Sequence, residues 1–295
     1  LISLRSVVRS HFPLPIKSIL MNKITMFCLS LNPNHLDLIQ KLNYTPVGLG
    51  KLNFNKSWIT DKGEKEISSK NEFYGEYTFH YKLWKNNFIT EKNWIGFCQY
   101  RKFWSEEVIN NQEINFSKFN SQILHDIPDH LNNYETIIGE SIHINQFKFS
   151  KFIKKNIVNF LAKPSLIFFK NKRNIKFHFD LMHGEGNLDK AISVMGSKDK
   201  NDFIEYVNTE VSFSPHNMFI CKNKNILMNY YNSLFPWLEE CEKLFGFRNL
   251  TGYGLKRIYG FLAERYMSFW FKKYTKYYLM PIYFKDISDF SYKDL

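Results

Sequence analysis

Short runs of hydrophobic residues alternate with helical patterns along most of the chain. The runs ITMFCLS (24–30), TPVGLG (45–50), WIGFCQY (94–100), ETIIGES (135–141) and PHNMFICK (215–222) predict buried strands. Helical spacing of apolar residues predicts helices near 188–195, 225–245 and 255–273, and Pro236 is expected to kink or interrupt the second of these. This alternation predicts an α/β fold with a helical C-terminal part.

The segment after the second predicted strand carries clear helix signals. Ser69 and Glu72 form an S-x-x-E capping box, which predicts a helix start. One aromatic face then recurs at helical spacing: Phe73, Tyr77, Tyr81 and Trp84. We therefore expect one helix from about residue 69 to about 86–87.

The domain organisation is simple. Residues 1–22 are expected to be a leader or extension, because basic residues and prolines interrupt the apolar stretch and Met21 reads like a natural start. Residues 23–275 are expected to form one domain with a variable, basic and aromatic insertion at 145–180, followed by a C-terminal tail at 276–295.

Composition narrows the range of partners. The net charge of +12 favours anionic partners such as nucleotide diphosphates, nucleic acid or an acidic membrane surface. No apolar run approaches the ~18–20 residues that span a bilayer. The four cysteines form no CxxC pair and three lie in apolar runs, so we expect buried thiols in a reducing compartment rather than disulfides or a zinc site. These features predict a cytoplasmic protein, peripheral at most on the inner face of the membrane.

The strand at 94–100 leads directly into basic and aromatic residues. In an open α/β sheet ligands bind beyond the carboxyl ends of the strands, so Gln99, Tyr100, Arg101 and Lys102 are expected to face that crevice. Cationic side chains there would stabilise the charge of a leaving diphosphate. The structural alternative is that Arg101 and Lys102 are ordinary surface residues after a strand.

Several motifs in order resemble the DUF4422 family of capsular-polysaccharide-synthesis glycosyltransferases. The strand end resembles the family's HYRR-aromatic-aromatic signature, and 59–87 resembles its helix block, with matches that include Asp61, Asn71 and Glu76. His183 resembles a family histidine, PHNMFICK resembles the N-M-F-I strand, and RIYGFLAERYMSFWF resembles R-x-x-G-F-x-x-E-R. The resemblance covers roughly residues 23–272. Gln99 and Lys102 depart from the family's His and second Arg, so neither a base nor a bidentate phosphate contact is carried over to them.

This resemblance implies a GT-A-like fold, a Rossmann-related mixed sheet flanked by helices, that binds a nucleotide sugar. It implies a hexosyl transfer, with UDP-galactose-type donors the first guess, to a capsular or lipid-linked glycan. The residues expected to bind the donor are Gln99, Tyr100, Arg101, Lys102, Asn71, Asn217, Asp61 and Arg265. Most such folds hold Mg²⁺ or Mn²⁺ at a D-x-D motif. Here cationic side chains occupy that place and the nearest similar spacing is Asp286–Asp289, so no metal ligand is predicted, although a divalent metal remains compatible.

A transferase of the inverting kind needs a group that deprotonates the acceptor hydroxyl. The predicted catalytic candidates are Glu264, Glu76 and His183, with Asp61 considered beside them. Each has a structural alternative. Glu264 pairs with Arg257 or Arg265, Glu76 is a helix-surface acid, and His183 is a satisfied core or loop histidine.

Two other functions compete with the enzyme. A non-catalytic scaffold of glycan assembly would keep the fold with an inactive site, and the two departures at Gln99 and Lys102 favour it. A nucleic-acid-binding protein would explain the charge, but no RRM, KH, zinc or helix-turn-helix pattern is present and the aromatic residues follow core spacing. We therefore expect no nucleic-acid partner.

Overall fold

The computed structural model describes residues 23–86, 88–89, 94–109, 114–146 and 173–290. The predicted leader at 1–22 and most of the predicted insertion at 145–180 lie outside these residues. Among the described residues, no helix is long and apolar enough to cross a membrane.

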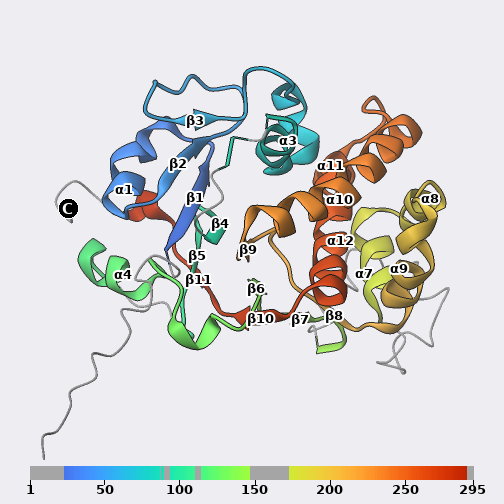
Figure 1. The fold of residues 1–295 in the computed structure, drawn as a ribbon. Coiled ribbons are helices and arrows are strands. Elements are labelled where there is room, and N and C mark those ends of the chain that lie inside the picture. Colours follow the sequence, from blue (N-terminus) through green and yellow to red (C-terminus); the bar gives the residue numbers. More distant parts are fainter. Residues whose placement is uncertain (1–22, 87, 90–93, 110–113, 147–172, 291–295) are drawn as a thin grey trace, which may run out of the picture.

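A mixed sheet forms the centre of the fold (Figure 1). Its path runs β10 (Tyr277–Met280), β6 (Thr136–Gly139), β9 (Phe219–Cys221), β4 (Trp94–Gln99), β1 (Ile24–Ser30), β2 (Thr45–Gly48) and β3 (Ile59–Thr60). Strands β4, β1, β2 and β3 are parallel neighbours, and β9 is antiparallel to both β4 and β6. After β4 the chain turns back into β5 (Lys102–Trp104), which pairs with β11 (Ile282–Phe284), while β7 (Ile142–His143) and β8 (Ser212–Phe213) form a separate pair.

Helices cover the two faces of the sheet. On one side lie α2 (Asn71–Tyr74), α3 (Tyr77–Asn86), α7 (Ile175–His183), α8 (Asn187–Ser193), α9 (Ser197–Thr209), α10 (Lys224–Phe245), α11 (Gly252–Lys256) and α12 (Ile258–Tyr274). On the other lie α1 (Leu36–Lys41) and α4 (Phe116–Gln122). Short 3-10 turns cover Pro33–His35, Ser68–Lys70, Asp129–Leu131, Ile144–Gln146 and Ile287–Asp289.

The central strands are apolar throughout because each face of the sheet packs against a layer. Side chains alternate along β1, so Phe27 joins the core under α3 and α10, whereas Met26 and Cys28 join the core beside α1 and α4. The four cysteines are buried, as the sequence predicts.

The predicted strands and the helices near 188–195, 225–245 and 255–273 are confirmed. Three details differ. The helix expected at 69–86 is divided at Gly75, the helix α10 continues through Pro236 without interruption, and the segment expected to be a tail supplies β10 and β11 to the sheet.

Candidate functional site

A cavity of about 360 Å³ opens at the carboxyl ends of the parallel strands. Leu29 of β1 and Gln99 of β4 are register partners, so both strands end at the same edge of the sheet. The cavity is lined by Leu29, Ser30, Leu31, Leu49, Asn71, Glu72, Gly75, Glu76, Gln99, Tyr100, Arg101, Lys102 and Arg257. Thus the predicted strand-end residues do line the crevice where an open α/β sheet binds ligands.

A second, smaller cavity of about 150 Å³ adjoins the first. Both are lined by Glu76, Gln99, Lys102 and Arg257. The second cavity adds His216, Asn217, Tyr253, Gly260, Phe261 and Glu264. The two spaces therefore form one divided site, with a carboxylate, an amide and two cations at the junction.

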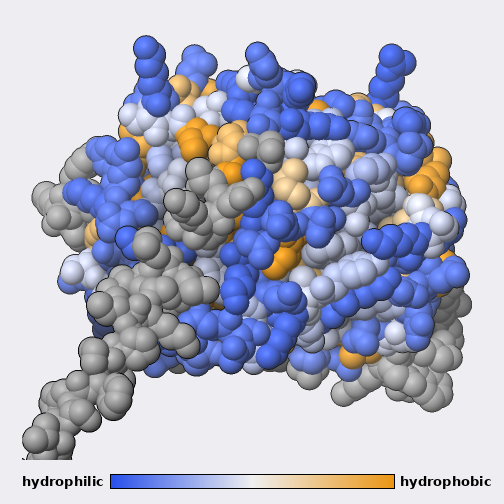
Figure 2. All heavy atoms as spheres, in the orientation of Figure 1, coloured by the Kyte–Doolittle hydropathy of each residue, from blue (hydrophilic) through white to orange (hydrophobic). Residues whose placement is uncertain are grey.

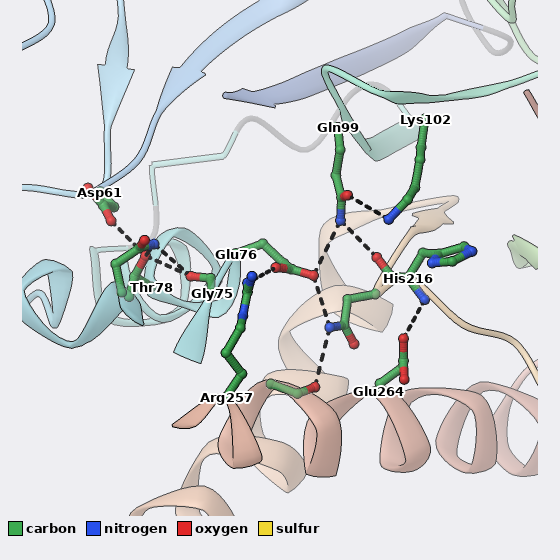
Figure 3. A network of polar contacts seen from close by, with 12 residues as sticks. Asp61, Gly75, Glu76, Thr78, Gln99, Lys102, His216, Arg257 and Glu264 are labelled. Carbon is green, nitrogen blue, oxygen red and sulfur yellow. Dashed lines mark hydrogen bonds and ion pairs between the residues drawn. The ribbon is translucent and has the colours of Figure 1, made fainter. Parts of the chain in front are cut away.

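Glu76 is the centre of the hydrogen-bond network at this junction (Figure 3). Its Oε1 accepts from Gln99 Nε2 at 3.3 Å and from Asn217 Nδ2 at 3.0 Å, and its Oε2 pairs with Arg257 Nη2 at 3.3 Å. The side chain is 15% exposed, so Glu76 is not the helix-surface acid that the sequence allowed. Charge-assisted contacts of this kind hold a carboxylate in one orientation.

The break at Gly75 places Glu76 in this position. Gly75 has φ 60° and ψ −134°, a combination that side chains disfavour, and it separates α2 from α3. A Cβ at Gly75 would lie 2.2 Å from Arg257 Nη2, so the glycine also makes room for the guanidinium. The capping box and periodicity predict helix on both sides, but not this break.

Two consecutive residues before β9 adopt left-handed backbone conformations. His216 has φ 81° and Asn217 has φ 54°, which is uncommon for residues other than glycine and clusters at functional sites. The amide of His216 donates to Glu264 Oε1 at 2.6 Å, and its carbonyl accepts from Gln99 Nε2 at 3.0 Å. Burial, aided by Lys102, lowers the pKa of His216 to about 3, so its ring is neutral at pH 7.

Glu264 is paired rather than free. Its second oxygen forms an ion pair with Arg265, which is 1% exposed and also contacts His178. Arg265 therefore lies behind Glu264, away from both cavities. Glu264 connects α12 to the left-handed turn, which makes it a positioning residue for His216 and Asn217.

The three cations at the site differ in enclosure. Lys102 Nζ donates to Gln99 Oε1 at 3.1 Å, and burial lowers its pKa while Glu76 and Glu264 oppose that shift. Arg101 has a side chain that is 61% exposed, pairs with Asp286 at 2.5 Å and lies over the Tyr100 ring at 4.8 Å. Arg257 is 34% exposed. The more enclosed charges are thus Lys102 and Arg257, and Arg101 forms the rim.

Asp61 and Asn71 form hydrogen bonds with residues around the first cavity. Asp61 is fully buried, and its Oδ2 accepts from Thr78 Oγ1 at 2.6 Å and from the amide of Gly50 at 3.3 Å. Burial raises the pKa of Asp61. Asn71 lines the cavity and donates to the carbonyl of Gly75 at 2.9 Å. Asp61 therefore fixes the walls without lining the cavity, whereas Asn71 does both.

His183 does not join the site. Its ring stacks on Phe261 at 4.0 Å and contacts the carbonyl of Gly254 at 3.1 Å, and burial lowers its pKa to about 3. Since it lines neither cavity, the interpretation as a satisfied core histidine describes its place.

Among the cavity residues that were not predicted, Gly75, His216 and Arg257 shape the hydrogen-bond network of the site. Arg257 stands in the family motif near Glu264, which was a usable signal, and it was considered only as a partner of Glu264. His216 precedes Asn217 in PHNMFICK, but hydrophobic periodicity does not predict its left-handed backbone conformation.

The side chains at the strand ends do not suit a divalent cation. Mg²⁺ and Mn²⁺ prefer carboxylate and carbonyl oxygens, whereas the first cavity is lined by Lys102, Arg101 and Arg257, and its two carboxylates, Glu72 and Glu76, are paired with Lys256 and Arg257. Among the described residues, no group of three or more His, Cys, Asp or Glu side chains could hold a metal ion.

A larger cavity of about 1010 Å³ lies between α10, α12 and the start of α9. Of the described residues that line it, none is a predicted site residue and none belongs to the carboxyl end of a parallel strand of the sheet. The divided site at the sheet edge is therefore the better candidate.

Comparisons with known proteins agree with this fold. The model of a domain of unknown function, DUF4422, matches residues 32–276. The apo structure of the bifunctional glycosyltransferase WbbM superposes with a TM-score of 0.64 and 20% identity over 90% of this chain and 45% of that one. The chain thus spans less than half of that protein, and the likeness confirms the predicted GT-A-like α/β fold.

A second solved structure, the mannosyltransferase Ktr4p from S. cerevisiae, has a TM-score of 0.32 and 12% identity over 90% of this chain and 68% of that one. A score this low does not establish a common fold. No curated protein matches the sequence.

Proposed function

The chain belongs to the DUF4422 family, and on this premise we propose that it is a glycosyltransferase that uses a nucleotide sugar as donor. The observation that carries the proposal is the divided cavity at the carboxyl ends of β1 and β4. Its larger part is lined by Arg101, Lys102 and Arg257 together with Glu72 and Glu76, and its smaller part by Glu76 and Glu264 together with Lys102 and Arg257. A diphosphate leaving group needs cations and a sugar hydroxyl needs a base, and the junction of the two parts offers Lys102, Arg257 and the carboxylate of Glu76.

The 360 Å³ part of the divided site would hold the donor, with its diphosphate toward Lys102 and Arg257. Departure of the nucleoside diphosphate builds negative charge on the phosphate oxygens, and fixed cations in a partly enclosed site stabilise that charge. Lys102 is held by Gln99 and Arg257 by Glu76, so both are oriented before the donor arrives. Pre-oriented charges need little reorganisation when the sugar–phosphate bond breaks.

The smaller cavity would receive the acceptor. Glu76 is the carboxylate that borders both cavities and is the best-placed general base of the predicted candidates. It would take the proton of the acceptor hydroxyl as the oxygen attacks the anomeric carbon and the diphosphate leaves. Asn217, which donates to Glu76, would orient this carboxylate or contact the donor sugar. Glu264 would hold the turn at His216 in place by accepting the hydrogen bond of its backbone amide.

The donor sugar and acceptor are proposed from the family resemblance. We expect a hexosyl unit, with UDP-galactose the first donor to test, and a capsular or lipid-linked glycan as acceptor. The net charge of +12 would favour a peripheral position at an acidic cytoplasmic membrane surface, where such acceptors are made. On the face drawn in Figure 2, hydrophilic residues predominate and hydrophobic ones form small separate patches, so electrostatic contact is the more plausible mode.

A thermal-shift screen tests the proposal. UDP-, GDP-, CMP- and dTDP-sugars would be added with and without Mn²⁺, because a ligand that binds only the folded state raises its apparent stability. One donor class should raise the melting temperature of the wild type, and Lys102→Ala should lose most of this shift. If no nucleotide sugar or nucleoside diphosphate shifts the wild type, the proposal is wrong. Binding without turnover across several acceptors would favour the scaffold function instead.

A further inference from the structure

The C-terminal segment after β11 pairs with the turn after β4, whose residues Tyr100 and Arg101 line the donor cavity. Residues 285–287 extend the pairing of β5 with β11, since the amide of Lys285 donates to the carbonyl of Arg101 at 3.2 Å and that of Ile287 to the carbonyl of Tyr100 at 3.1 Å. In Figure 1 the red C-terminal turn lies beside α1, at the opposite end of the sequence. This segment lies beyond the residues that the family model matches, which end at 276.

Asp286 contacts the cation at the rim of the donor cavity. Its Oδ2 accepts from Arg101 Nε at 2.5 Å, while its Oδ1 caps the turn by accepting from the amide of Ser288 at 2.9 Å. The guanidinium is thereby held over the ring of Tyr100. This bond uses only Nε, and among the described residues no hydrogen bond engages the two terminal nitrogens of Arg101, so the planar fork can bind a phosphate through both.

Ser288 is connected through His35 to Ser30, another residue that lines the same cavity. Ser288 Oγ lies 2.8 Å from His35 Nε2, and Ser30 Oγ lies 2.8 Å from His35 Nδ1. Ser30 ends β1 and lines the donor cavity, and the His35 ring packs on Tyr100 at 5.0 Å. One short turn therefore supports both the loop after β1 and the turn after β4.

We infer that the segment at 285–290 is a working part of the nucleotide-diphosphate site, in which Asp286 is a positioning residue for Arg101 and Ser288 positions the loop after β1 through His35. The inference rests on the proposed function, because it assumes that the cavity binds a nucleoside diphosphate. The segment adds no group that touches the reacting atoms. It holds the guanidinium of Arg101 in one orientation toward the expected position of the phosphates.

Nucleoside diphosphate affinity and donor kinetics test this role. In Asp286→Asn the side-chain oxygen still caps Ser288, but the charge that holds Arg101 Nε is lost. We expect the dissociation constant of the nucleoside diphosphate and the KM of the donor to rise about 3- to 5-fold, as for a partly exposed charged pair, with an unchanged melting temperature. Asp202→Asn is the matched control and should leave both constants unchanged, since Asp202 is also 58% exposed, pairs with Lys273 and lines neither cavity.

A double-mutant cycle gives the decisive readout. In an Arg101→Ala background, Asp286→Asn should leave the dissociation constant unchanged, because the residue through which it acts is absent. The inference is wrong if Asp286→Asn raises the dissociation constant by the same factor in the Arg101→Ala background as in the wild type. It is also wrong if Asp286→Asn alone binds the nucleoside diphosphate more tightly. Wild-type protein that binds no nucleoside diphosphate would instead reject the proposed function, so the two failures are distinguishable.

Discussion

Replacement of Gly75 by alanine should remove Arg257 from the site. The new Cβ would lie 2.2 Å from Arg257 Nη2, far inside any tolerated contact, so the guanidinium must withdraw and give up its 3.3 Å pair with Glu76. The backbone at φ 60° and ψ −134° would add strain of ~1–3 kcal/mol. Loss of one pre-oriented electrostatic donor costs about 10²–10³ in kcat in well-studied sites. With two other cations present, we expect kcat/KM to fall about 10- to 100-fold.

The assay is donor-dependent transfer or donor hydrolysis, with thermal unfolding measured in parallel. Gly186→Ala is the matched control, because Gly186 also has positive φ, at 76°, but a Cβ there meets no atom within 4 Å. It should lower the melting temperature while leaving kcat/KM within about 2-fold, since backbone strain alone does not reach the site. Adding Arg257→Ala to Gly75→Ala should cause no further loss. Near-normal kcat/KM in Gly75→Ala, or an equal loss in Gly186→Ala, would refute the reasoning.

Four further outcomes are expected. Glu76→Gln should lower kcat by about 10²-fold or more, as removal of a general base does, and a normal kcat would exclude that role. Lys102→Ala should reduce turnover by about 10²-fold and Arg101→Ala by less, because Arg101 is the more exposed cation; the reverse order in steady-state assays would contradict the assignment. Burial lowers the pKa of His80 to about 3, so below pH ~6.5 the unfolded chain binds a proton that the folded chain does not. The free energy of unfolding should therefore decrease as the pH is lowered from ~6.5 to ~3, by up to ~1.4 kcal/mol per pH unit. Denaturant titrations at pH 7 and pH 5 should show a smaller difference for His80→Gln than for the wild type. Finally, EDTA should leave most of the activity, and complete loss that Mn²⁺ restores would show that the cations do not replace a metal.

The sequence alone determined the strands, the main helices and the place where chemistry was expected. Hydrophobic runs mark β1, β2, β4 and β6 because a strand buried on both faces must be apolar at every position. The sequence therefore predicts that the polar residues after β4 lie at the carboxyl edge of the sheet, and Gln99 to Lys102 do line the cavity there. Motif order identified the family, which the family model confirms.

Tertiary structure decided which of the candidate side chains meet. Glu76 contacts Gln99, Asn217 and Arg257, which are 23, 141 and 181 residues away along the chain. Periodicity reports only which face of an element is buried, so it ranked His183 with Glu76 although their surroundings differ completely. The sequence predicts a tail at 276–295, yet Asp286 contacts Arg101 across a separation of 185 residues. Contacts of this length depend on how the layers pack against the sheet, and no local pattern in the chain encodes that packing directly.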